Sequence, residues 1–280
     1  MSKHTEWATA LSTARTDYEF LSEIYSYGIT AIELSVHEWE CKNIDWSGLS
    51  ENAKKSGVAL WSYHLPFGDL TDISSTCEDN RQKALEFLFS LIDKACEIGI
   101  KRFIIHPSYE PIEDDERAEK MACAKRSLAA LADYADKYGA VICVEDLPRS
   151  CLGHDVAEMC ELVSADDRLR VCFDVNHLLD CFGCTHADFV SALGDKIITV
   201  HMSDYDFVDE KHFFCGNGLI DWDELIGLLE GIGYNGPFLY EGGFAPSARK
   251  PDVPFGTLDK ARERQMNIRS FRGRNGGIAK

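Results

Sequence analysis

Residues 140–145 read AVICVE and residues 169–174 read LRVCFD, and both are short apolar runs that end in a carboxylate. A continuous apolar run of this length is typical of a parallel strand that is buried on both faces. Six more runs of similar character bring the number of predicted strands to eight. In chain order the eight are Trp7–Ser12, Ala31–Ser35, Val58–His64, Arg102–His106, Val141–Glu145, Leu169–Asp174, Ile197–His201 and Phe238–Glu241.

Amphipathic segments separate these strands. In Asp79–Ile98 and Glu113–Tyr138 the apolar residues recur at steps of three and four, which predicts helices with one buried face. Strands and helices that alternate over 280 residues predict a single (β/α)8 TIM-barrel domain across residues 1–280, with a frayed tail at residues 273–280. A doubly wound open sheet is the alternative, but no glycine-rich phosphate loop follows the first predicted strand.

The net charge and the apolar runs of the sequence limit the partners and the location that we expect. The formal net charge is −18, from 47 acidic and 29 basic residues. Proteins that bind nucleic acid or anionic membranes usually present a basic surface, so we expect neither partner. The first residues contain no apolar signal-peptide core and no run is long enough to span a bilayer, so we expect a cytoplasmic location.

The chain contains eleven cysteines. Several, such as Cys143 and Cys172, lie in apolar runs, where a buried and reduced thiol is expected. A chain with a core this large does not need a disulfide framework. Cys181 and Cys184 have the spacing of a zinc-binding pair and His186 follows them, but a closed zinc site needs a second pair that the sequence lacks. We therefore interpret these cysteines as ordinary free thiols.

Six of the predicted strands end in an acidic residue or a histidine. A lone histidine at such a position is usually satisfied by a backbone carbonyl, whereas a buried carboxylate without a partner is costly. In a TIM barrel the carboxyl ends of the strands form the active-site face, so these side chains are expected to meet there. They are His64, His106, Glu145, Asp174, His201 and Glu241.

Four of the six belong to consecutive strands and predict a metal site: Glu145, Asp174, His201 and Glu241. A divalent cation would neutralise most of their charge. Three carboxylates and one imidazole form a hard, oxygen-rich ligand set, which favours Mn²⁺ or Mg²⁺ and is compatible with Co²⁺, Fe²⁺ or Zn²⁺. We expect one divalent metal ion, with Mn²⁺ preferred.

An ordered series of motifs at these strand ends carries a family resemblance. The motifs are HLPF (64–67), FIIHPS (103–108), VED (144–146), FDVNH (173–177), HMSD (201–204), HFFCGNGLIDW (212–222) and YEGG (240–243). With them the chain resembles the xylose isomerase-like barrel superfamily, and within it the sugar (phosphate) isomerase/epimerase group that includes ketose 3-epimerases. Each motif alone is weak, but their order at the right strand ends is specific.

The resemblance implies the same four metal ligands and adds substrate contacts. His177 falls where such enzymes contact substrate, and His212 would also line the site. Two departures bear on the substrate. Residues 215–218 read CGNG where the family usually has Pro-Gly-Glu-Gly, and the arginine that 3-epimerases place shortly after the metal-binding histidine is absent. The family also implies a possible homo-oligomer, as a dimer or tetramer.

The expected chemistry is proton transfer on a small sugar-like substrate. A metal that chelates a carbonyl and the adjacent hydroxyl stabilises an ene-diolate. Glu145 and Glu241 are the expected acid and base, and His64 and His106 would bind hydroxyls across the pocket. Epimerisation, aldose–ketose isomerisation and dehydration all remain open, as does phosphorylation of the substrate. Arg149 is one candidate anion contact, and the backbone at Gly242–Gly243 is another.

Two other functions are compatible with the sequence. The first is an endonuclease IV-type apurinic nuclease, in which His64, His106, His177, Glu210 and His212 would complete a multi-zinc cluster; the net charge of −18 argues against it. The second is a sugar- or metal-binding sensor. It is less favoured because binding alone does not require two candidate bases. The number of bound metal ions separates the first alternative from sugar chemistry.

Overall fold

The computed structural model describes residues 9–213, 215 and 217–241. Eight parallel strands pair in the order β7-β6-β5-β4-β3-β2-β1-β8. The ring closes between β7 and β8 through a parallel bridge from Met202 to Tyr240, with a 2.8 Å hydrogen bond from the Met202 N–H to the Leu239 carbonyl. The strands are β1 (Thr9–Thr13), β2 (Ala31–Ser35), β3 (Ala59–His64), β4 (Arg102–Ile105), β5 (Val141–Glu145), β6 (Arg170–Asp174), β7 (Ile197–His201) and β8 (Phe238–Tyr240).

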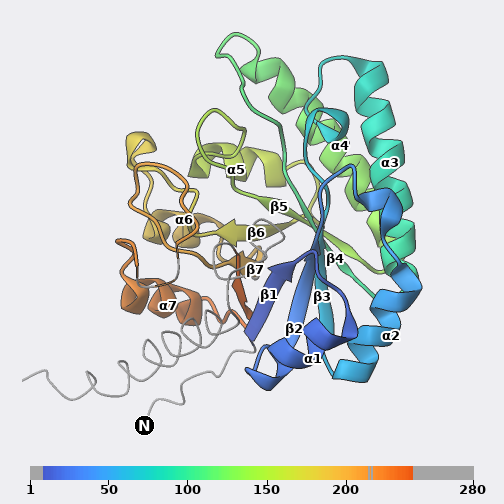
Figure 1. Cartoon of the computed structure of the whole chain (residues 1–280). Helices are drawn as coiled ribbons and strands as arrows, with labels where there is room; N and C mark the ends of the chain where they lie inside the picture. Colours follow the sequence, from blue (N-terminus) through green and yellow to red (C-terminus); the bar gives the residue numbers. More distant parts are fainter. Residues whose placement is uncertain (1–8, 214, 216, 242–280) are drawn as a thin grey trace, which may run out of the picture.

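Helices connect the strands and surround them, with the strands in the centre (Figure 1). This arrangement confirms the predicted (β/α)8 barrel. The described residues contain seven α-helices and three short 3₁₀ helices, the latter at Cys41–Asn43, Asp69–Thr71 and Asp180–Phe182. The α-helices are α1 (Tyr18–Ser26), α2 (Trp46–Ser56), α3 (Glu78–Glu97), α4 (Arg117–Asp136), α5 (Val156–Val163), α6 (His186–Leu193) and α7 (Trp222–Gly231).

The predicted element boundaries differ from the observed ones by a few residues. Helix α4 begins at Arg117 rather than at Glu113, because the acidic residues 113–116 lie just before the helix, where negative charge favours its positive end. Strand β1 starts at Thr9, and residues 7 and 8 of the predicted strand lie outside the described part, as does the predicted frayed tail.

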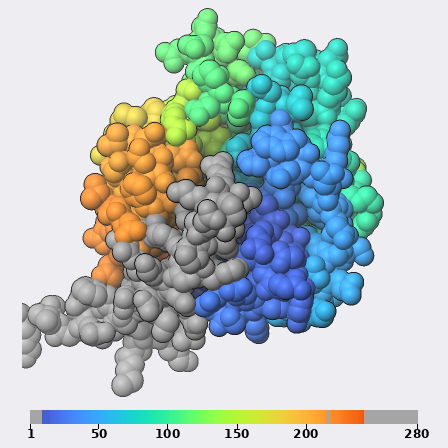
Figure 2. Space-filling model, viewed as in Figure 1, coloured from blue at the N-terminus to red at the C-terminus, as the bar shows by residue number. Residues whose placement is uncertain are grey.

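Figure 2 shows the early (blue) and late (orange) segments on opposite sides of one view.

The helices begin and end at the residues that local chemistry favours. The Asp221 carboxylate accepts hydrogen bonds from the N–H groups of Asp223 and Glu224 and so caps α7. Gly57 ends α2 at a φ of 81°, a left-handed conformation that glycine adopts without steric cost. No helix in the described part of the chain has the length and apolarity needed to cross a bilayer.

The cysteines are free thiols, as predicted. Cys143 and Cys172 are fully buried and pack with Ile104 in a small cluster of their own. The alternative zinc interpretation of Cys181 and Cys184 finds no support, because these residues and His186 do not form a ligand group among the described residues. The His186 Nε2 instead lies 2.9 Å from the Val175 carbonyl.

Packing of the helical shell on the barrel should dominate stability. Leu88 in α3 is fully buried in the main apolar core, so Leu88→Ala is expected to lower the free energy of unfolding by about 2–5 kcal/mol. Leu70 is 73% exposed, and Leu70→Ala should change it by less than about 0.5 kcal/mol. Urea unfolding of both variants checks this, and equal losses would contradict the assigned core.

Candidate active site

Four titratable side chains meet at the carboxyl end of the barrel around the imidazole of His201. Its Nδ1 lies 2.9 Å from Glu145 Oε1, 2.8 Å from Glu241 Oε2 and 3.8 Å from Asp174 Oδ2. One ligand atom from each of the four residues lies within 4.8 Å of the others. We call Glu145, Asp174, His201 and Glu241 the central group. They are the four residues that the strand ends predict as metal ligands.

Strand register explains why these residues meet. Asp174 and His201 are paired across β6 and β7, and Glu145 ends the neighbouring strand β5. The bridge between Met202 and Tyr240 then brings Glu241, the residue after β8, beside β7. The four positions therefore follow from parallel strands whose carboxyl ends lie at the same end of a closed ring.

The central group has the properties of a cation site. Asp174 and His201 are fully buried and Glu145 is 1% exposed. Asp174 Oδ2 and Glu241 Oε2 are buried oxygens without a hydrogen-bond donor. Leaving buried carboxylate oxygens unsatisfied is costly, and a hard divalent cation would satisfy them. The residues therefore fit such an ion.

The pKa values of the carboxyls reflect this crowding. Burial raises the pKa of Asp174 to about 7, with His177 opposing the shift and Glu241 adding to it. Burial would also raise the pKa of Glu145, but the imidazoles of His201 and His106 outweigh it and hold that pKa well below its usual range. One carboxyl of the site thus holds a proton near neutral pH while another stays ionised.

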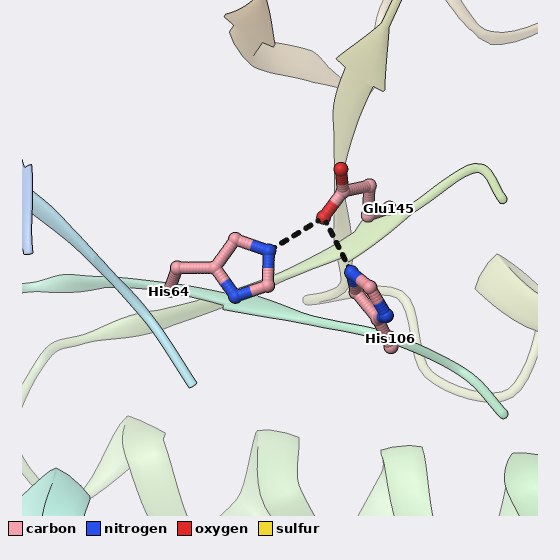
Figure 3. Close-up of side chains that lie close together, drawn as sticks. All are labelled: His64, His106 and Glu145. Carbon is pink, nitrogen blue, oxygen red and sulfur yellow. Dashed lines mark hydrogen bonds and ion pairs between the residues drawn. The ribbon is translucent and has the colours of Figure 1, made fainter. Parts of the chain in front are cut away.

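A second group shares Glu145. Its Oε2 lies 3.0 Å from His64 Nε2 and 3.3 Å from His106 Nε2, with the two imidazoles on one side of the carboxylate (Figure 3). The Phe67 ring stacks on His106 with centroids 4.1 Å apart. His64 and His106, expected to bind substrate hydroxyls, are thus placed to bind a cation together with Glu145 as well.

A third group joins His177, Glu210 and His212. Glu210 Oε1 lies 2.7 Å from His212 Nε2 and 3.8 Å from His177 Nε2. Hydrogen bonds from the two histidines hold the pKa of Glu210 below its usual range. His177 Nε2 is also 3.5 Å from Asp174 Oδ2, so this group adjoins the central one.

Arg149 does not offer a free positive charge to an anion. Its guanidinium pairs with Glu110 at 3.1 Å, with Asp209 at 2.8 Å and with Glu210 at 3.1 Å. Three carboxylates more than neutralise one arginine, which argues against Arg149 as the candidate anion contact. The other candidate contact, Gly242–Gly243, lies outside the described residues.

Aromatic side chains stand exposed in the loops that follow β2, β3 and β7. Trp39 is 68% exposed, Phe67 46% and Phe213 40%. Trp39 stacks on His37 with centroids 4.4 Å apart, and Phe67 contacts two site histidines, His64 and His106. These two ring contacts place Phe67 at the site.

One residue beside the central group was not anticipated. Glu33 in β2 is fully buried, and its Oε1 lies 3.0 Å from His201 Nε2. The sequence signal that could have identified Glu33 is its position in the middle of the apolar strand AIELS, because an acid inside a buried strand needs a specific partner.

Comparisons with known proteins agree with this architecture. A sequence profile of the family described as xylose isomerase-like TIM barrel matches residues 21–255. An uncharacterised protein of Methanocaldococcus jannaschii is 30% identical over 255 residues, which cover 84% of this chain and 85% of the relative. The crystal structure of a D-tagatose 3-epimerase-like protein superposes with a TM-score of 0.79 at 23% identity, over 94% of this chain and 97% of that one.

Two further relatives carry functional names. A ketose 3-epimerase of Arthrobacter globiformis is 25% identical over 200 residues, or 69% of this chain and 66% of the relative. A probable endonuclease 4 of Campylobacter concisus is 23% identical over 207 residues, or 65% of this chain and 71% of the relative. The profile match spans most of the chain, and on that basis the chain belongs to the xylose isomerase-like TIM-barrel family.

Proposed function

We propose that this protein is a divalent-metal-dependent isomerase or epimerase of a small sugar-like substrate. The observation that carries the proposal is the convergence of Glu145, Asp174, His201 and Glu241 at the carboxyl end of a closed barrel. Their donor set suits Mn²⁺ best. The likeness to a ketose 3-epimerase supports the substrate class.

A divalent ion held by the central group supplies a Lewis acid that stabilises negative charge on a sugar carbonyl and its neighbouring hydroxyl. Glu145 and Glu241 are the acid and base, because they reach the site from strands that are not neighbours in the ring. When one removes a proton from carbon and the other returns a proton to the opposite face, the product is the epimer. Return to the adjacent carbon gives isomerisation, and loss of a hydroxyl gives dehydration.

Exposure separates the four histidines expected to bind substrate. His106 is 16% exposed and His212 26%, whereas His64 is 3% and His177 5% exposed. A substrate hydroxyl can reach the first two more easily. We therefore assign substrate contact first to His106 and His212, and assign His64 and His177 to holding the carboxylates of the site.

Deuterium incorporation tests the reaction. The Mn²⁺-loaded protein, incubated with ketoses, aldoses and their phosphates in D₂O, is expected to place deuterium on a carbon next to a carbonyl. Glu145→Gln and Glu241→Gln should each slow this by about 10²–10⁴-fold, because each removes one proton carrier. The matched control is Glu97→Gln, since Glu97 is a surface residue paired with Lys94. Metal content is measured in each variant, and full exchange in both site variants refutes the mechanism.

A second candidate function is phosphoester hydrolysis at a multi-metal centre. Its specific support is that the second and third groups flank the central one and that Glu145 belongs to two of the three. Clustered divalent ions favour in-line attack on a phosphoester. The likeness to a probable endonuclease 4 is consistent with this candidate, but the net charge of −18 disfavours a nucleic-acid substrate.

Metal stoichiometry decides between the two candidates. If only the central group binds metal, as we expect, elemental analysis should find one ion per chain, and neither His106→Ala nor His212→Ala should change that number. Three ions per chain, falling with each variant, would instead favour hydrolysis. Assays of both variants with a phosphodiester such as bis(p-nitrophenyl) phosphate would complete the comparison.

Metal affinity should fall as the pH decreases. The raised pKa of Asp174, about 7, means that this carboxyl holds a proton below neutral pH and must release it before it can bind a cation. We therefore expect Mn²⁺ to bind roughly tenfold more weakly for each pH unit below 7 and to release protons on binding. Calorimetric titrations at pH 6 and pH 8, in buffers with different ionisation enthalpies, measure both effects. Equal affinity at the two pH values would contradict this expectation.

A further inference from the structure

Glu33 is a buried carboxylate that lies behind the central group. It belongs to β2, on the other side of the ring from β5–β7, and its side chain is fully buried. Glu33 Oε2 accepts a 2.7 Å hydrogen bond from the Ser62 hydroxyl. Glu33 Oε1 has no hydrogen-bond donor, although it lies 3.0 Å from His201 Nε2, which is also without a hydrogen-bond partner. The two unsatisfied atoms therefore lie within hydrogen-bond distance of each other.

His201 differs from three other histidines of the site in the partner of its second ring nitrogen, the one that does not face the carboxylates of the three groups. In the other three histidines this nitrogen contacts a neutral oxygen, whereas in His201 it lies beside the carboxylate of Glu33. The neutral contacts are His64 Nδ1 with the Leu65 carbonyl at 2.9 Å, His177 Nδ1 with the Asp146 carbonyl at 2.7 Å and His212 Nδ1 with the Ser203 hydroxyl at 3.2 Å.

The orientation of the His201 ring defines the role of each nitrogen. Nδ1 faces Glu145 and Glu241, so Nδ1 is the atom that can bind a cation. A neutral imidazole that binds metal through Nδ1 carries its hydrogen on Nε2. Glu33 Oε1 lies 3.0 Å from Nε2, within reach of that hydrogen. A carboxylate in this position fixes the ring and makes the imidazole a stronger donor to the metal.

Energetics argue against a purely structural role for Glu33. A fully buried carboxylate that receives one hydroxyl hydrogen bond is costly to keep, and an apolar or amide side chain of similar size would cost less. The presence of the acid is economical when an imidazole N–H completes its hydrogen bonding. A cation bound at Nδ1 would fix the tautomer that presents this N–H.

We propose that Glu33 is a positioning residue for the metal site, which acts through His201 and strengthens the binding of a divalent ion by the central group. This inference rests on the proposed function only in requiring that the central group binds a metal. Glu33 itself touches neither the metal nor the substrate. Ser62 supports the same arrangement from β3 by holding the other carboxylate oxygen.

Co²⁺ titration of the chelator-treated full chain tests the proposal, with binding followed by visible absorption and by calorimetry. Glu33→Gln, which keeps the shape and removes the charge, is expected to weaken the tightest Co²⁺ equivalent by about 10–100-fold and to alter its absorption bands. Ser62→Ala should weaken binding in the same direction by a smaller factor, and it replaces Glu33→Gln if that variant does not fold.

The matched control is Asp204→Asn. Asp204 is also fully buried, and its two carboxylate oxygens accept a 2.9 Å hydrogen bond from Trp222 Nε1 and a 3.2 Å hydrogen bond from the Ile220 N–H. This variant should lower the unfolding midpoint of the metal-free protein and leave Co²⁺ affinity close to wild type. If Glu33→Gln behaves in the same way, Glu33 is structural and the proposal is overturned. If the wild type binds no Co²⁺, the proposed function is overturned as well.

Discussion

Three carboxylates gathered around a single, fully buried imidazole are the constraint on which this site depends. Two of the four residues are fully buried, and Asp174 Oδ2 and Glu241 Oε2 receive no hydrogen bond. Like charges at this separation repel strongly where water is scarce, so the arrangement needs a compensating positive charge. His201 can supply one such charge, and a divalent ion supplies two. The chemistry that we propose exploits this requirement, because the cation that compensates the carboxylates would also act on the substrate.

The polar groups around the central group extend across the barrel rather than stopping at four ligands. Glu145 connects the central group to His64 and His106, and His177 connects it to Glu210 and His212. Glu33 and Ser62 approach from behind. Most of these side chains are held by two contacts each, so the positions of their donor atoms are set before any ligand arrives. Preorganisation of this kind is what a site for proton transfer or for metal-assisted hydrolysis requires.

The residues at the strand ends account for most of what could be predicted from the sequence about the fold and the site. The barrel and the meeting of Glu145, Asp174, His201 and Glu241 follow from apolar runs of similar length that each end in a titratable residue, because the ends of parallel strands coincide. Three features were beyond this reasoning. The sharing of Glu145 between two groups depends on which of its oxygens each imidazole approaches, and sequence spacing contains no such information. Glu33 lies in the middle of a strand, so attention to strand ends passes over it, and the start of α4 depends on charge near a helix end rather than on periodicity.

Closure of the ring between β7 and β8 has a consequence for how the site forms during folding. The same backbone pairing that joins Met202 to Tyr240 delivers Glu241, so a chain whose last strand has not yet docked possesses three of the four central donors. If the central group binds a cation, as we propose, cation binding and docking of β8 would each favour the other by the same free energy. Occupancy of the central group would then report how completely β8 is docked, and removal of the metal would loosen the pairing between β7 and β8.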